Sequence, residues 1–244
     1  MWKKEKVLGI VGGMGPLATQ LFYRMLIDMT DAEKDQDHLN MIILNHASMP
    51  DRTELIKTGK SDQLFEALLK DARKLENDGV AAIAIPCNTS HMVVDRLQEM
   101  IDVPIIHMIR ETVKSIKRER PEIKQIGILA TDGTIGSGLY QQACVDEDIR
   151  PFIPSKEGQA LVMKIIYEGI KGNNPVDYND LIKVKDELAA KGCEAVIMGC
   201  TELSCVKEMY DLPSYYVDAM EILAAKSITM CGKALKERET QEGV

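Results

Sequence analysis

The chain has 244 residues, of which 45% are hydrophobic and 28% are charged, the composition of an ordinary globular protein. Its 30 lysines and arginines against 38 aspartates and glutamates give a net charge of -8. This argues against a protein that binds nucleic-acid phosphates, because that class is usually basic. No apolar run approaches the roughly 18–20 residues that span a bilayer, so we expect no membrane-spanning segment. The expected partner is a small molecule, with neither nucleic acid nor membrane.

The first apolar stretch, residues 7–11, follows three lysines as in a signal peptide, but Gly12 and Gly13 end it and no small-residue cleavage site follows. We interpret it as a buried strand. The six cysteines are scattered along the chain without any Cys-x-x-Cys pair. This pattern predicts free thiols in a reducing, cytoplasmic environment and no metal site.

Short hydrophobic runs alternate with longer stretches of helical periodicity. Strands are predicted at residues 6–11, 41–45, 80–86, 104–107, 125–130, 195–198 and 214–217. Helices are predicted at about 16–29, 61–77, 92–100, 110–118, 138–146, 158–169, 178–190 and 218–236. The clearest helix, 61–77, has a leucine stripe, with Ser61 as its expected cap and Gly79 as its stop. Strands separated by helices predict mostly parallel sheets covered on both faces, so the fold class is α/β.

Two parts of the chain resemble each other. Residues 79–87 (GVAAIAIPC) and 192–200 (GCEAVIMGC) each place a glycine before a strand-like run that ends in a cysteine. Upstream of these two, residues 9–15 (GIVGGMG) align with residues 127–133 (GILATDG). The conserved order of the matches within this one sequence favours an internal duplication.

Both cysteines of the repeat lie where a predicted strand ends, which is the edge at which open α/β sheets hold their ligands. If the two halves pack about a pseudo-twofold axis, Cys87 faces Cys200 across the cleft between them. A helix can begin just after each cysteine and offer its backbone N–H groups to an anion. The other four cysteines are expected to be small buried hydrophobic residues.

Two opposed thiols can perform a reaction that neither can perform alone. One, as a thiolate, removes a proton from a carbon atom, and the other, as a thiol, delivers a proton to the opposite face. This chemistry is racemisation by two bases. A nearly symmetric site suits it because the two directions of the reaction are mirror images.

Four short motifs are spread over the chain: GGMGP at 12–16, PDR at 50–52, PCNTSH at 86–91 and GCTE at 199–202. Together they resemble the cofactor-independent aspartate/glutamate racemase family, most closely its aspartate racemases, over about residues 7–218. The resemblance implies two similar flavodoxin-like subdomains with parallel sheets related by a pseudo-twofold axis, and an active site in the cleft between them. We expect these subdomains at residues 1–103 with 213–244 and at 104–212. The resemblance also implies a homodimer that acts on an amino-acid substrate without pyridoxal phosphate or another cofactor.

The resemblance also implies a role for individual residues. Cys87 and Cys200 match the two catalytic acid/base thiols. Asn88, Thr89 and Thr201 match residues whose side chains and N–H groups hold the α-carboxylate and the amine of the substrate.

A second group of residues is expected to recognise the rest of the substrate. Arg52 and Lys171 match basic residues that face its second carboxylate, and an arginine can hold a carboxylate through two parallel hydrogen bonds. Thr131, in the loop equivalent to the first glycine loop, is a further binding candidate.

The chain departs from the family pattern at three positions. Glu202 replaces the histidine typical of glutamate racemases, which argues against that branch. Met14 stands where those enzymes place an aspartate, so the ionisation of the first thiol lacks an explanation. Ser90 stands where alanine is more frequent, and the neighbouring His91 is expected to be a structural helix residue rather than a base.

The predicted activity is interconversion of L- and D-aspartate. Alternatives within the superfamily are a broad-specificity amino-acid racemase, or a maleate-isomerase-like or hydantoin-racemase-like enzyme, which also use paired cysteines. A dinucleotide-dependent oxidoreductase is a further alternative because residues 13–18 fit G-x-G-x-x-G/A, although Asn45 and His46 stand where an acidic residue would hold a ribose. A non-catalytic amino-acid sensor is the last alternative, and two intact cysteines speak against it.

Overall fold

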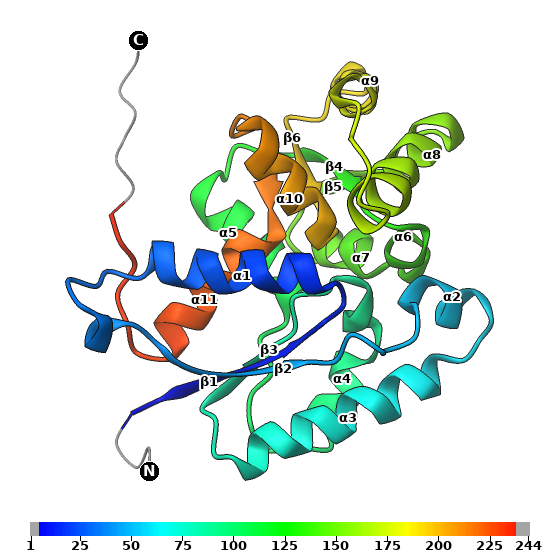
Figure 1. Ribbon diagram of the computed structural model, residues 1–244. Coiled ribbons are helices and arrows are strands. Elements are labelled where there is room, and N and C mark those ends of the chain that lie inside the picture. Colours follow the sequence, from blue (N-terminus) through cyan, green and yellow to red (C-terminus); the bar gives the residue numbers. More distant parts are fainter. Residues whose placement is uncertain (1–4, 238–244) are drawn as a thin grey trace.

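The computed structural model describes residues 5–237, which fold into two parallel sheets surrounded by helices (Figure 1). The strands are β1 (Val7–Gly12), β2 (Asn40–Asn45), β3 (Ala82–Ala84), β4 (Gln125–Leu129), β5 (Arg150–Phe152), β6 (Ala195–Met198) and β7 (Tyr216–Asp218). The α-helices are α1 (Pro16–Met29), α2 (Arg52–Lys57), α3 (Ser61–Asn77), α4 (Val94–Gln98), α5 (Met108–Glu119), α6 (Asp132–Ser137), α7 (Leu139–Asp146), α8 (Lys156–Lys164), α9 (Tyr178–Ala190), α10 (Thr201–Tyr210) and α11 (Ala219–Met230). Two 3₁₀ turns cover Asp35–Asp37 and Thr89–Val93, and a π-helix covers Ile165–Lys171.

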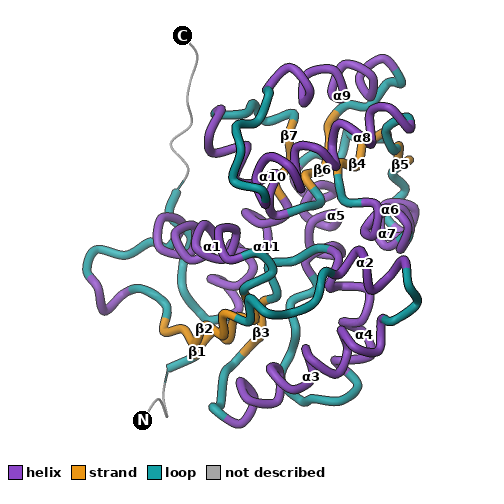
Figure 2. The backbone as a smooth tube through the Cα atoms, turned by 45° about the vertical axis from the view of Figure 1, so that its right-hand side comes forward, coloured by secondary structure: helices purple, strands orange, loops and turns teal. Residues whose placement is uncertain are grey.

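The first sheet has the strand order β2-β1-β3 and the second has β5-β4-β6-β7, with every pairing parallel. Figure 2 shows the two sheets in separate halves of the molecule. Strand β1 is apolar throughout because both of its faces are buried. Leu8 and Ile10 belong to the core that includes residues of α1 and α11, whereas Val7 and Val11 pack with residues of α3. The α/β class expected from the sequence is confirmed.

The central strands of the two sheets carry equivalent glycines. A Cβ atom added at Gly9 of β1 would lie 3.0 Å from Leu75 Cδ1 of α3. A Cβ atom added at Gly127 of β4 would lie 2.7 Å from Leu188 Cδ1 of α9. Each glycine therefore lets a long helix approach its sheet closely. This correspondence supports the internal duplication inferred from the sequence.

Several predicted elements match the structure closely, and others do not. The helices at 16–29, 61–77 and 178–190 have the predicted bounds. Ser61 is not a cap, because it is already the first helical residue and Lys60 precedes it without a side-chain cap hydrogen bond. The predicted strand at 104–107 is reduced to a single bridge between Ile83 and Ile105. Strand β5 and helices α2 and α6 were not among the predicted elements, and α10 was expected only as a helix that can begin after Cys200.

The expected subdomain boundaries, 103/104 and 212/213, fall in connections outside the strands and α-helices. Each is followed by a segment that pairs with the sheet of the preceding half, since Ile105 bridges to β3 and β7 pairs with β6. Judged by hydrogen bonding, the chain therefore passes from one half to the other a few residues after each expected boundary. The division into 1–103 with 213–244 and 104–212 stays a prediction. Among residues 5–237, no helix is long and apolar enough to cross a membrane.

Candidate active site

Cys87 and Cys200 line one cavity, at the ends of equivalent strands in the two sheets. Cys87 follows β3 and precedes the 3₁₀ turn at Thr89–Val93, and Cys200 follows β6 and is the N-cap residue of α10. Their exposed fractions are only 5% and 6%. The cavity is lined by Met14, Asp51, Arg52, Thr53, Cys87, Asn88, Thr89, Thr131, Tyr167, Lys171, Cys200, Thr201 and Glu202. All eight site residues expected from the sequence are therefore brought together.

The Cys200 thiol has a carboxylate partner. Its Sγ donates a hydrogen bond to Glu202 Oε2 at 2.8 Å, and Glu202 Oε1 lies 3.7 Å from Lys171 Nζ. Burial raises the pKa of Cys200 well above the usual value, the Glu202 charge raises it further, and Lys171 lowers it. This environment favours the protonated thiol.

The Cys87 side chain has a cationic neighbour, because it lies close enough to the Arg52 guanidinium for the two charges to interact. Burial lowers the pKa of Arg52, but the negative charges of Cys87 and Asp51 outweigh this and raise it above the usual value. A guanidinium beside a thiol stabilises the thiolate. The two thiols of the cavity therefore stand beside charges of opposite sign.

The Arg52 side chain is itself fixed in place, with an exposed fraction of 8%. Its guanidinium donates to the carbonyl oxygens of Met14 at 3.2 Å, Pro50 at 3.1 Å and Met49 at 3.4 Å. The Met14 side chain, in the glycine loop, accepts a 3.4 Å hydrogen bond from the Ser90 hydroxyl. Here the charge beside the first thiol comes from Arg52 and not from the glycine loop.

Asp51 and Tyr167 complete the charged side of the cavity. The Tyr167 hydroxyl donates to Asp51 Oδ2 at 3.1 Å, and Lys171 Nζ lies 3.9 Å from the same oxygen and 4.7 Å from the centre of the Tyr167 ring. Burial raises the pKa of Asp51, but the Glu54 N–H, Lys171 and other donors hold it below its usual value. Asp51 is therefore a charged neighbour of Lys171.

Three threonine hydroxyls meet between the two sheets. Thr89 Oγ1 lies 3.1 Å from Thr131 Oγ1 and 2.8 Å from Thr134 Oγ1. Thr131 also caps α6, because its hydroxyl accepts a hydrogen bond from the Thr134 N–H. Thr201, the first residue of α10, supplies a backbone N–H that has no partner within the helix. These groups form the neutral, donor-rich side of the cavity.

His91 is structural, as expected. Its Nδ1 donates to the Cys87 carbonyl oxygen at 2.9 Å and its Nε2 accepts from the Met108 N–H at 3.0 Å. Burial lowers its pKa, so the ring stays neutral and ties the first cysteine loop to α5. The cysteines outside the cavity are buried free thiols, at positions 144, 193, 205 and 231.

Some cavity residues were not identified as site residues in the sequence. Asp51 and Glu202 stand inside the recognised motifs without an expected binding role, and Tyr167 stands four residues before Lys171. Helical spacing of four places two side chains on one face, so this spacing was an available signal for Tyr167. No group of three or more histidine, cysteine, aspartate or glutamate side chains within residues 5–237 has a metal-binding arrangement.

Residues 11–226 match the Asp/Glu/hydantoin racemase family. The chain belongs to this family. It is 31% identical to the aspartate racemase of Picrophilus torridus, with a TM-score of 0.82 over 95% of this chain and 96% of that one. It is 28% identical to the broad-specificity amino-acid racemase RacX of Bacillus subtilis (strain 168), over 91% of this chain and 97% of the relative.

More distant members of the racemase family share the fold. A glutamate racemase from Francisella tularensis, solved with D-glutamate, has a TM-score of 0.63 at 20% identity over 93% of this chain and 80% of that one. The family assignment displaces the alternative of a dinucleotide-dependent oxidoreductase. A Cβ atom added at Gly13 would lie 2.5 Å from the His46 backbone, so this glycine allows close packing of the two loops.

Proposed function

We propose that this racemase interconverts L- and D-aspartate by proton transfer between the substrate α-carbon and two cysteines. The observation that carries the proposal is that Cys87 and Cys200 line one cavity with opposite charges beside them, Arg52 for the first and Glu202 for the second. A two-base reaction needs one deprotonated and one protonated group at the start, and these partners favour that distribution.

The proton transfers follow from this distribution. In one direction the Cys87 thiolate removes the α-proton and becomes a thiol, while the α-carbon becomes a carbanion. The Cys200 thiol then delivers its proton to the opposite face and becomes a thiolate. Lys171, 3.7 Å from Glu202, offsets the charge that develops beside that carboxylate. The reverse direction starts from the Cys200 thiolate and ends with a proton on Cys200.

The carboxylates of the substrate would meet donors on two sides. Thr89, Thr131 and Thr201 are suited to the α-carboxylate through hydroxyl and helix N-terminal N–H groups. Arg52 and Lys171 would hold the side-chain carboxylate and also stabilise charge that develops as the α-proton leaves. No step in this reaction requires pyridoxal phosphate or a metal ion, so we expect a cofactor-independent enzyme.

A broader substrate range is the second candidate function. Asp51 lies 3.9 Å from Lys171, and the Glu202 carboxylate lies 3.7 Å from it, so the cations of the cavity are already partly neutralised. Such a cavity does not require a dianionic substrate, and a broad-specificity racemase is among the relatives. Loss of optical rotation over a panel of single enantiomers, with α-proton exchange in heavy water, tests both candidates. Activity confined to aspartate supports the first, and comparable activity on neutral or basic amino acids supports the second.

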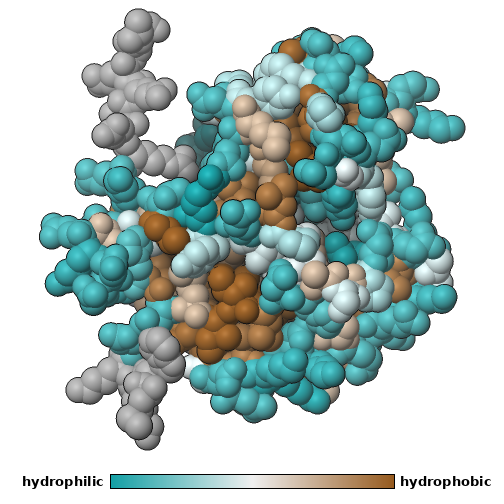
Figure 3. All heavy atoms as spheres, viewed as in Figure 1, coloured by the Kyte–Doolittle hydropathy of each residue, from teal (hydrophilic) through white to brown (hydrophobic). Residues whose placement is uncertain are grey.

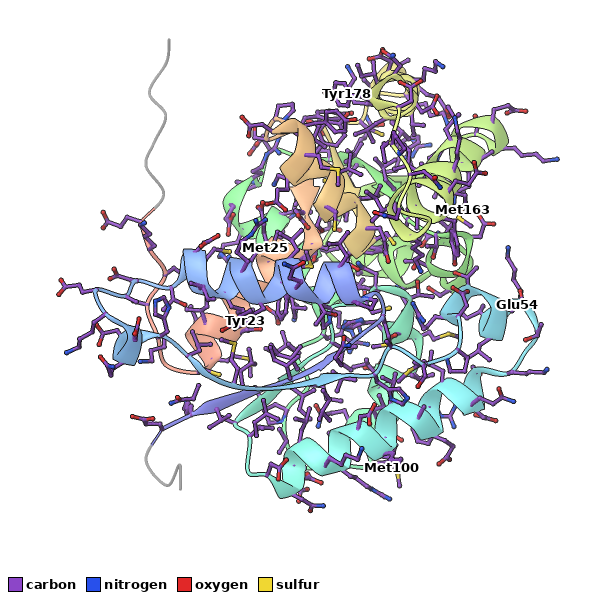
Figure 4. The ribbon with its side chains drawn as sticks, viewed as in Figure 1. Tyr23, Met25, Glu54, Met100, Met163 and Tyr178 are labelled. Carbon is purple, nitrogen blue, oxygen red and sulfur yellow. The ribbon has the colours of Figure 1, made fainter. Side chains whose placement is uncertain are left out.

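We also propose that the enzyme is a cytoplasmic homodimer that uses the edge of the first sheet. Strand β2 is an edge strand without charge or proline, and such edges are usually covered. Ile43 on β2 is 38% exposed, and Leu17 and Tyr23 on α1 are 46% and 42% exposed. Figure 3 shows apolar side chains on this face below α1, and Figure 4 shows Tyr23 on the side of α1 nearer to β2. Sedimentation equilibrium should give a dimer, and Ile43→Lys should shift it toward monomer.

A further inference from the structure

A buried tyrosine joins the two cysteine loops. Tyr140 of α7 has an exposed fraction of 0%, and its hydroxyl donates a hydrogen bond of 2.6 Å to Asn88 Oδ1. Asn88 follows Cys87 in the loop after β3, whereas α7 packs in the core of the second sheet. The contact therefore crosses from one sheet region to the other and ends on a cavity residue.

This hydrogen bond fixes the orientation of the Asn88 amide. Because Oδ1 accepts from Tyr140, the amide nitrogen Nδ2 is turned away from it, and Nδ2 is buried without a partner in the structure. A buried donor without a partner is costly unless a ligand meets it. Asn88 lines the cavity together with both cysteines, so we expect Nδ2 to donate a hydrogen bond to an acceptor on the substrate.

The position of the Tyr140 ring depends on the second cysteine motif. A Cβ atom at Gly199, the residue before Cys200, would lie 2.9 Å from Tyr140 Cε2 and 3.2 Å from the Ala130 Cβ. Real Cβ atoms do not approach a carbon as closely as 2.9 Å without displacing it. The glycine of the GCTE motif thus makes room for the ring.

We propose that Tyr140 is a positioning residue that holds the Asn88 amide with Nδ2 toward a carboxylate oxygen of the substrate. The inference rests on the proposed racemase function and deepens it by assigning a direction to the Asn88 contact. Nδ2 can only donate, so it recognises a carboxylate and not the ammonium group. Burial raises the pKa of Tyr140 well above its usual value, which keeps the hydroxyl protonated and able to donate.

The test is a double-mutant cycle on the purified full-length enzyme. Tyr140→Phe lets the Asn88 amide rotate, so kcat/KM for aspartate should fall roughly fivefold to tenfold, mostly through KM. In an Asn88→Ala background the same substitution should have no further effect, because the group that Tyr140 positions is gone. Asn88→Asp keeps the acceptor for Tyr140 but loses the donor, so it should lose at least as much kcat/KM.

Tyr215→Phe is the matched control, since it removes a tyrosine hydroxyl that donates to the Cys193 carbonyl at 3.1 Å, outside the cavity. Its kcat/KM should equal that of the unmodified enzyme. An unchanged kcat/KM in Tyr140→Phe, or an equal loss with and without Asn88, would overturn the positioning role while the racemase function stands. If the unmodified enzyme racemises no amino acid, the proposed function fails, and the positioning role fails with it.

Discussion

The Cys200 thiol donates a hydrogen bond to the Glu202 carboxylate at 2.8 Å, and this contact distinguishes it from Cys87, whose partner is a guanidinium. The two thiols come from equivalent places in an internal repeat, but the charges around them are not equivalent. This asymmetry is the reason why the proposed mechanism places the proton of the free enzyme on Cys200.

Removing the Glu202 charge should make Cys200 ionise at lower pH. Glu202→Gln abolishes the carboxylate that raises the pKa of this thiol, whereas Lys171 continues to lower it. The rate of Cys200 alkylation by iodoacetamide, followed by peptide mass spectrometry against pH, should rise several-fold at neutral pH. Glu208→Gln, on the exposed side of the same helix, is the control and should leave the profile unchanged. A Glu202→Gln profile that coincides with that of the unmodified enzyme would show that this carboxylate does not control the thiol.

Arg52 should set the preference for an acidic side chain. Arg52→Ala removes a charge-assisted donor worth roughly 1.5–3 kcal/mol, so kcat/KM for aspartate should fall about ten- to a hundredfold. Turnover of alanine should also fall, because the Cys87 thiolate loses its cationic neighbour, but by a smaller factor than turnover of aspartate. Because Arg52 also donates to the Met14 and Pro50 carbonyls, thermal unfolding must be measured alongside. Equal losses for both substrates would mean that Arg52 supports the loops, or the Cys87 thiolate, rather than specificity.

Buried Asp218 should make stability depend on pH. Burial and the nearby Glu221 charge together raise its pKa to about 6, against the lowering effects of Lys207 and the hydrogen bond from Ser204. Between the usual value of 3.8 and about 6, the folded state keeps a proton that the unfolded state has lost. The contribution of Asp218 to stability is therefore present at low pH and is lost as pH rises through about 6.

Asp218→Asn removes this titration and keeps a side-chain oxygen for the cap of α11. The free energy of unfolding of the native chain, measured relative to Asp218→Asn by urea denaturation, should fall by up to about 3 kcal/mol between pH 4 and pH 7. The exposed Asp28→Asn is the control and should show a nearly constant difference. A constant difference for Asp218→Asn as well would contradict the assignment.

The reaction should need no added cofactor, since the two thiols supply both proton-transfer partners. We expect full activity after exhaustive dialysis against a chelator, and no absorbance band of pyridoxal phosphate in the purified enzyme. Restoration of activity only by a metal ion or by pyridoxal phosphate would rule out the two-cysteine mechanism as written.

The sequence carried more information about the strand ends than about contacts between loops. The pairing of Cys87 with Cys200 could be predicted because both follow hydrophobic runs in a repeat, and parallel strands end at one edge of a sheet. The Cys200–Glu202 contact could not, because residues two apart on a helix do not face each other. It arises because Cys200 is the N-cap residue with extended backbone, φ -145° and ψ 132°, which turns its thiol toward the first turn.

Other features could not be predicted from the sequence, for similar physical reasons. The contact between Tyr140 and Asn88 joins residues 52 positions apart and depends on how the two sheets are placed. Strand β5 escaped prediction because it has three residues and includes Pro151 at the edge of its sheet. The degree to which Arg52 is buried could not be predicted either, since arginine side chains are usually exposed.

The measurement that tests the two-cysteine mechanism most directly compares Cys87→Ser with Cys200→Ser in heavy water. Serine is nearly isosteric with cysteine but far less acidic, so each variant should lose racemisation while the cavity remains intact. Each variant retains one thiol on one side of the substrate. One variant should therefore exchange the α-proton of one aspartate enantiomer, and the other variant should exchange the α-proton of the opposite enantiomer. Proton NMR follows both exchanges as loss of the α-proton signal. Substantial racemisation in both directions by either variant would contradict the mechanism, because the missing thiol would then not be a proton carrier.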